Sequence, residues 1–160
     1  EGCSLFAPVP FRYKKPVCYY GDSITQGACA SRPGNNFPNH VSRWLNCDFI
    51  NLGFSGSAKG EDEIADYVAG LPMSAFIYDY DYNAPSAEHL EKTHERMFRI
   101  IRERNPKLPI VILSAPIYRA EKEFEKRLAV IKQTYQNALA PCGSHRRRAG
   151  PGDRLGGMAP

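Results

Sequence analysis

Four short runs rich in apolar residues constrain the fold of this chain more than any other feature of its sequence. They occupy residues 16–20, 48–52, 75–80 and 109–114. Each run is too short for a typical helix, and the segments that follow the third and fourth runs hold apolar residues at helical spacing. Strands that alternate with helices in this order form a parallel sheet with helices on both faces. The sequence therefore predicts an α/β fold.

The predicted helices alternate with these strands. They cover residues 37–45, 61–69, 86–104 and about 120–139. Ser86 is a favourable cap for the third helix, and Gly70 is a favourable end for the second. Because the run 109–114 is apolar almost throughout, we expect the fourth strand to be covered on both faces. The elements together predict three layers, α/β/α.

The two ends of the chain differ in composition from its middle. Residues 141–160 hold five Gly, three Pro and four Arg, with no aromatic or β-branched residue. Such a segment predicts a disordered tail. Residues 1–15 resemble a linker, so we place the domain at residues 16–140. The last predicted helix leads into the tail and not into a fifth strand, and we expect the chain to be shortened at both ends.

The charge and the cysteines exclude several classes of function. The net charge is +4, but residues 1–142 carry 17 Lys and Arg against 16 Asp and Glu. A nearly neutral domain argues against nucleic-acid binding. No apolar run approaches the ~18 residues that span a bilayer, and the five cysteines form no CxxC pair. The sequence implies no membrane segment, metal or organic cofactor. It does not decide between a cytoplasmic protein and an exported one whose leader has been removed.

The first strand ends in Gly21-Asp22-Ser23. A glycine directly after a strand allows a sharp turn, and the serine then opens the next segment with its hydroxyl exposed. Free backbone N–H groups at such a turn can bind an oxyanion. Ser23 is therefore a candidate nucleophile.

Two further strand ends carry groups that suit the same site. The second strand leads to Gly56, where a glycine lets a backbone N–H approach a ligand closely. The third leads to Asn83, whose side-chain amide is a hydrogen-bond donor. Functional groups of parallel α/β sheets gather just beyond the carboxyl ends of the strands. We therefore expect Ser23, Gly56 and Asn83 to face a common point.

These three blocks, in this order, resemble the SGNH, or GDSL, hydrolase family. The longer run Tyr20-Gly21-Asp22-Ser23-Ile24-Thr25-Gln26-Gly27 is similar to a bacterial subgroup of that family. The resemblance covers residues 16 to about 139 and implies a flavodoxin-like fold, whose fifth strand this chain lacks. It also implies a serine ester hydrolase that acts through an acyl-serine. The implied substrates are short-chain or acetyl esters, acylated carbohydrate among them.

The resemblance also assigns roles to individual residues. Ser23 Oγ would attack the ester carbonyl. The backbone N–H groups of Ser23 and Gly56 and the side chain of Asn83 would bind the oxyanion, each donor being worth about 3 kcal/mol of barrier.

The family further uses a histidine base within a C-terminal Asp-x-x-His block, and this sequence holds no such block. Asp153 is followed three residues later by Gly156, and His145 is the only late histidine. Because a disordered segment cannot hold a base in place, we do not expect His145 to act as one. His40, His89 and His94 are expected to be surface or packing residues.

Three readings therefore stay open. The first is an active serine ester hydrolase. The second is a catalytically impaired fragment that keeps the nucleophile and the oxyanion donors but cannot activate the serine. The third is a flavodoxin-like module that binds an anion. An open sheet edge also predicts a homodimer by strand pairing.

Overall fold

The computed structural model describes residues 2–114 and 122–139. Its elements are β1 (Val17–Gly21), α1 (Ser23–Gln26), α2 (Phe37–Leu45), β2 (Phe49–Gly53), α3 (Asp62–Ala69), β3 (Ala75–Asp79), α4 (Ala87–Arg104), β4 (Ile110–Ile112) and α5 (Lys122–Leu139). The predicted strands and helices are confirmed, with shifts of at most two residues at their ends. The single turn α1 was not predicted. The predicted tail at 141–160 lies outside the described residues.

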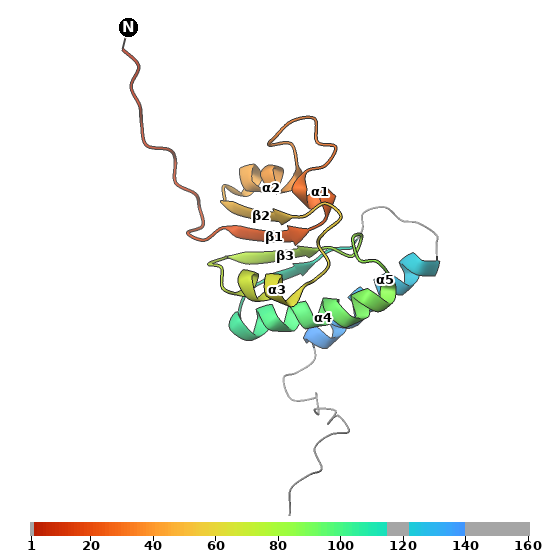
Figure 1. Cartoon of the computed structure of the whole chain (residues 1–160). Helices are drawn as coiled ribbons and strands as arrows, with labels where there is room; N and C mark the ends of the chain where they lie inside the picture. The colour runs from red at the N-terminus through yellow and green to blue at the C-terminus, as the bar shows by residue number, and fades with distance from the viewer. Residues whose placement is uncertain (1, 115–121, 140–160) are drawn as a thin grey trace, which may run out of the picture.

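The strands form one parallel sheet in the order β2-β1-β3-β4 (Figure 1). At its centre, Tyr19 of β1 pairs with Asn51 of β2 and with Ile77 of β3. β1 lies between β2 and β3 and is parallel to both. The carboxyl ends of these three strands therefore lie side by side. The predicted parallel α/β arrangement is confirmed, with four strands among the described residues.

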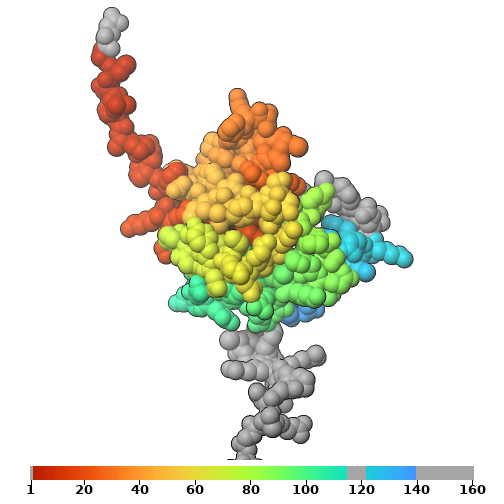
Figure 2. Space-filling view, viewed as in Figure 1, coloured from red at the N-terminus to blue at the C-terminus, as the bar shows by residue number. Residues whose placement is uncertain are grey.

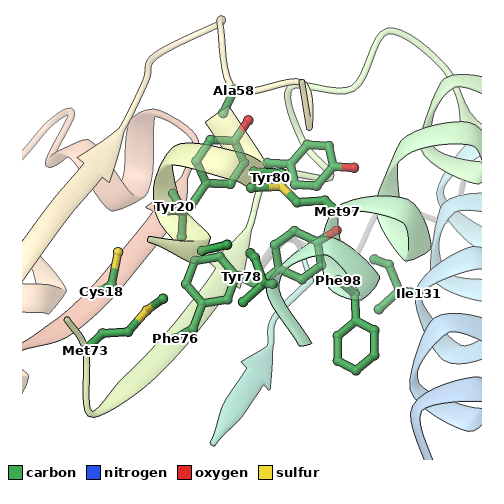
Figure 3. Close-up of a cluster of buried hydrophobic side chains, with 14 of the residues drawn as sticks. Cys18, Tyr20, Ala58, Met73, Phe76, Tyr78, Tyr80, Met97, Phe98 and Ile131 are labelled. Atoms are coloured by element: carbon green, nitrogen blue, oxygen red, sulfur yellow. The ribbon is translucent and has the colours of Figure 1, made fainter. Parts of the chain in front are cut away.

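The larger core lies between the sheet and the helices α3, α4 and α5 (Figures 1 and 3). Side chains alternate along a strand, so Cys18 and Tyr20 of β1 point into this core, as do Phe76 and Tyr78 of β3. The helices contribute buried residues at helical spacing: Ala65, Val68 and Ala69 from α3, Leu90, Met97 and Ile101 from α4, and Ile131 from α5. This core supports the strands β1, β2 and β3, whose carboxyl ends lead to the candidate residues.

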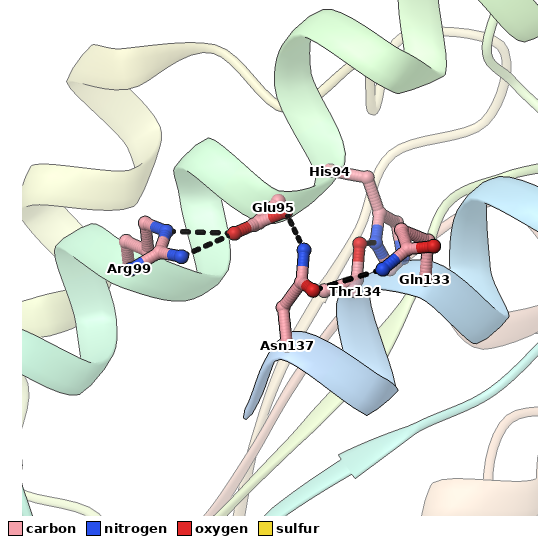
Figure 4. Close-up of polar contacts among 6 residues, drawn as sticks. All are labelled: His94, Glu95, Arg99, Gln133, Thr134 and Asn137. Carbon is pink, nitrogen blue, oxygen red and sulfur yellow. Dashed lines mark hydrogen bonds and ion pairs between the residues drawn. The ribbon is translucent and has the colours of Figure 1, made fainter. Parts of the chain in front are cut away.

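Side-chain hydrogen bonds join α4 to α5 beside this core (Figure 4). The buried His94 ring contacts Thr134 through Nδ1 at 2.9 Å. Nearer the surface, Asn137 donates to Glu95 at 2.6 Å, and Glu95 also pairs with Arg99. These bonds place α5 firmly against α4.

The opposite face of the sheet carries a smaller core. Val17 and Tyr19 of β1 pack there with Cys47, and Phe37 of α2 contributes to the same cluster. At β4, however, Val111 is 45% exposed. The prediction that the fourth strand is covered on both faces is therefore wrong: α2 packs beside β2 at the other edge of the sheet, and an apolar run does not reveal which helix reaches it.

The segment before β1 extends away from the domain without helix or strand (Figures 1 and 2). Its side chains are exposed, among them Leu5 and Phe6. Its attachment is through backbone, because the Arg12 N–H donates to the Asn46 carbonyl at 2.8 Å. None of the helices described is long and apolar enough to cross a membrane. The predicted homodimer through an open sheet edge stays a prediction.

Candidate active site

Ser23 is the first residue of α1, the helical turn that follows β1. Asp22 caps this turn, and its Oδ1 accepts from the N–H groups of Ile24 at 2.6 Å and Thr25 at 3.4 Å. The Gln26 N–H donates to the Asp22 carbonyl at 3.0 Å. Of the four N–H groups in α1, only that of Ser23 has no hydrogen-bond partner among the described residues. A free N–H beside the serine hydroxyl is the arrangement an oxyanion donor requires.

The turn is held tightly against β3. A Cβ on Gly21 would lie 2.3 Å from Thr25 Oγ1 and 2.4 Å from the Asp79 carbonyl oxygen, so only glycine fits there. The buried Thr25 hydroxyl donates to Asp79 Oδ2 at 2.9 Å. Burial raises the pKa of Asp79 to about 6, although the Thr25 hydrogen bond opposes the shift. This buried pair fixes the orientation of the turn that carries Ser23.

Gly56 lies in the exposed turn that follows β2. Its φ is +68°, a value that favours glycine, and a Cβ there would meet open space. The neighbouring N–H groups are bonded: Phe54 to the Gly21 carbonyl at 2.9 Å, Ser55 to Gln26 Oε1 at 2.9 Å, and Ser57 and Ala58 to the Phe54 carbonyl at 3.0 and 3.1 Å. Within this turn, from Phe54 to Ala58, the Gly56 N–H alone has no partner among the described residues.

Asn83 lies in the turn between β3 and α4. Its side-chain amide donates to the Phe54 carbonyl at 2.9 Å, which ties this turn to the one that carries Gly56. An amide has two N–H donors, and this bond uses one of them. The Gln26 side chain likewise ties α1 to the turn after β2 through Ser55. The structure thus joins the three turns of Ser23, Gly56 and Asn83 directly by hydrogen bonds.

The three histidines of the described residues are engaged elsewhere. His40 contacts Arg43 on α2 at 3.1 Å, and His89 Nε2 contacts the Lys59 carbonyl at 2.8 Å. His94 is buried between α4 and α5, and burial lowers its pKa to about 4. They occupy surface and packing positions, as predicted. The candidate base His145 lies outside the described residues.

Metal ligands do not gather here either. No three side chains of His, Cys, Asp or Glu within 2–114 and 122–139 are arranged to hold a metal ion.

Several residues that shape this site were not found from the sequence. The Thr25–Asp79 pair links residues 54 positions apart. Arg127 of α5 donates to the carbonyls of Asp81 at 2.6 Å and Ala84 at 2.7 Å, on either side of Asn83. Neither pair leaves a local pattern in the sequence, because the partners meet only when the sheet and its helices assemble.

Known proteins are similar to this chain in sequence and in fold. The sequence model of the GDSL-like lipase/acylhydrolase family matches residues 14–145. The chain belongs to this family. The predicted membership of a family of lipases and acylhydrolases is therefore confirmed. No curated protein sequence matches the chain.

Three solved structures share the fold of this chain. The structure named as a GDSL-like lipase from Bacteroides ovatus is 31% identical, with a TM-score of 0.71 over 81% of this chain and 40% of that one. The SGNH-hydrolase family esterase AlinE4 is 18% identical, with a TM-score of 0.52 over 91% and 87%. A family two carbohydrate esterase from Clostridium thermocellum is 14% identical, with a TM-score of 0.59 over 84% and 52%.

These likenesses confirm the flavodoxin-like fold of the SGNH hydrolases. The chain spans about 40% of the length of the Bacteroides ovatus protein. The predicted domain boundaries at residues 16 and 140 stay predictions.

Proposed function

We propose that this chain hydrolyses carboxylic esters through an acyl-serine, with Ser23 as the nucleophile. One observation carries the proposal. In two turns whose other N–H groups are bonded, the N–H groups of Ser23 and Gly56 are without partners among the described residues. Asn83 adds a side-chain N–H to the same cluster of turns. Donors kept free at the position of a serine hydroxyl suit the oxyanion of acyl transfer.

In the proposed reaction Ser23 Oγ attacks the carbonyl carbon of the ester, and its proton leaves to a base. The carbonyl oxygen becomes an oxyanion that accepts from Ser23, Gly56 and Asn83. Collapse of this intermediate expels the alcohol, which takes up a proton, and leaves an acyl group on Ser23. Water then attacks the acyl-serine and releases the carboxylic acid.

A second candidate is favoured by the positions of the histidines. Since His40, His89 and His94 bond elsewhere, none of them acts on Ser23 in the described part of the chain. A serine without a base stays protonated and is a weak nucleophile. The site would then keep its oxyanion donors, with a residual acceleration of about 10³- to 10⁴-fold over water.

The substrate is proposed to be a small acyl ester, and acylated carbohydrate is one class to test. Family membership supports ester chemistry, and one fold relative is named as a carbohydrate esterase in complex with cellohexaose. The proposal needs no cofactor, because the attacking and stabilising groups all come from the chain.

The deciding experiment compares the chain with its Ser23→Ala variant on p-nitrophenyl acetate. We expect a burst of one p-nitrophenol per chain from wild type and none from the variant. Continued turnover would favour the active hydrolase, whereas slow release without a burst would favour the impaired site, because a serine without a base is acylated slowly. A fluorophosphonate should label Ser23. A folded wild type that shows neither burst nor label, but binds inorganic phosphate, would overturn the proposal in favour of an anion-binding module.

Two further variants test the oxyanion donors. Asn83→Asp keeps the size of the side chain but removes its N–H groups, and we expect the rate of acylation to fall about 100-fold. Gly56→Ala tests the backbone donor: it keeps its N–H and its Cβ would meet open space, so we expect a smaller loss of acylation rate than for Asn83→Asp. An alanine at the positive φ of position 56 should cost about 1–2 kcal/mol of stability. Equal acylation rates for Asn83→Asp and wild type would remove Asn83 from the mechanism.

A further inference from the structure

The turn that carries Asn83 is held from α5, a helix about 40 residues further along the chain. Arg127 donates from one guanidinium nitrogen to the carbonyls of Asp81 at 2.6 Å and Ala84 at 2.7 Å. These two carbonyls flank Asn83 on both sides. The Arg127 side chain is 16% exposed, so these bonds are largely shielded from water.

Glu123, one helical turn before Arg127, holds the other end of the same segment. Its Oε1 accepts a hydrogen bond at 2.7 Å from the N–H of Ala87, which is the first residue of α4. It also pairs with Arg127 Nε at 3.3 Å. The two side chains therefore form a clamp over residues 81–87, which we call the Glu123–Arg127 clamp.

The clamp adds to the bonds that hold the Asn83 turn from within and from the turn after β2. Within the turn, backbone bonds join Asn83 to Tyr80 at 3.0 Å and Ala84 to Asp81 at 3.3 Å. The Asn83 amide must also keep its 2.9 Å bond to the Phe54 carbonyl if its second N–H is to stay aimed at the oxyanion. Displacement of a catalytic group by about 1 Å can cost 100-fold in rate.

We propose that Glu123 and Arg127 are positioning residues for the Asn83 amide. The inference rests on the proposed role of Asn83 as an oxyanion donor. The Arg127 guanidinium suits this task because it is planar, always charged and donates several hydrogen bonds at once. A lysine offers a single ammonium on a flexible stem, so Arg127→Lys would hold the turn less well despite its equal charge.

The test uses ¹⁵N-labelled full-length chain and does not depend on activity. Arg127→Met removes the donors and keeps an apolar stem. We expect amide hydrogen exchange across 81–87 to quicken about tenfold to 100-fold, because two charge-assisted hydrogen bonds are lost. The Asn83 side-chain amide signal, assigned by its absence in Asn83→Asp, should move towards the shift of a free asparagine. Arg96→Met is the matched control. Arg96 lies away from this turn and forms an ion pair with Asp62, with 2.5 Å between the charged groups.

Two more variants keep the test decisive if Arg127→Met does not fold. Arg127→Lys should quicken the amide exchange across 81–87 less than Arg127→Met does. Glu123→Gln keeps an acceptor for the Ala87 N–H and should quicken it less again. Unchanged exchange and an unchanged Asn83 signal in folded variants would overturn the proposal. So would faster exchange with the Asn83 signal still in place, because the clamp would then be merely structural.

Acylation by p-nitrophenyl acetate supplies the functional arm. We expect Arg127→Met to lower the acylation rate at least tenfold, with KM changed less than twofold, since the oxyanion donor acts in the transition state. Rates equal to wild type would overturn the positioning role. A wild type without any acylation would contradict the proposed function alone, and the exchange measurement would still decide whether the clamp holds Asn83.

Discussion

The buried Asp79 carboxylate provides a quantitative test of how the nucleophile turn is held. Burial is the main cause that raises its pKa from 3.8 to about 6, and the neighbouring Asp22 and Asp81 carboxylates add to the shift. The folded chain therefore holds this proton more tightly than the unfolded chain. Stability falls as the pH rises from about 4 to about 6, and the full penalty above that range is about 3 kcal/mol.

Asp79→Asn removes this penalty without changing the size of the side chain, because an amide oxygen still accepts from Thr25. As the pH rises from 4.5 to 7.5, Asp79 should lower the free energy of unfolding of wild type by about 2 kcal/mol, and the variant should not show this loss. The wild-type slope by itself is not diagnostic, since burial lowers the pKa of His94 to about 4. His94 destabilises the fold as the pH falls from 6.5 towards 4. Between pH 7.5 and pH 4.5 this lowers the free energy of unfolding by about 2.5 kcal/mol. The difference between variant and wild type isolates Asp79.

The assay is urea unfolding followed by circular dichroism at pH 4.5, 6.0 and 7.5. Thr25→Val completes a double-mutant cycle with Asp79→Asn. At pH 7.5 the Thr25 change should cost about 2 kcal/mol in wild type, where the bond is to a charged group. In the Asp79→Asn background, Thr25→Val should cost about 1 kcal/mol, because the bond is then to a neutral group. Parallel pH profiles for wild type and Asp79→Asn, within about 0.5 kcal/mol, would refute the assignment of a raised pKa to the buried Asp79.

Three further outcomes test the packing. Gly53→Ala should destabilise the chain by about 3 kcal/mol, seen as a lower Tm, because its Cβ would lie 2.2 Å from the Gln26 backbone nitrogen; an unchanged Tm would contradict that contact. Arg96→Met should cost less than about 1 kcal/mol in urea unfolding, since its partner Asp62 is exposed, and a larger loss would show that the pair is more than a surface salt bridge. His94→Gln should reduce the loss of stability between pH 7.5 and 4.5 by about 2.5 kcal/mol, and an unchanged loss would count against a buried neutral histidine.

Much of the fold followed from local patterns. The strand ending at Gly21 and the helix capped by Ser86 were predicted to within one residue, because turn and cap preferences act between neighbours. The fourth strand shows the limit of this reasoning. Its apolar run suggested cover on both faces, yet Val111 is exposed, since cover depends on where a distant helix packs.

For the site, the sequence by itself determined which residues to examine: Ser23, Gly56 and Asn83 follow three successive strands, and their order matches the family. Only the tertiary structure decided how their turns are joined. The Phe54 carbonyl meets the Asn83 amide 29 positions away, and Arg127 reaches the same turn from α5. Such contacts leave no periodic signal along the chain, because parallel strands bring their ends together only after the helices between them have packed.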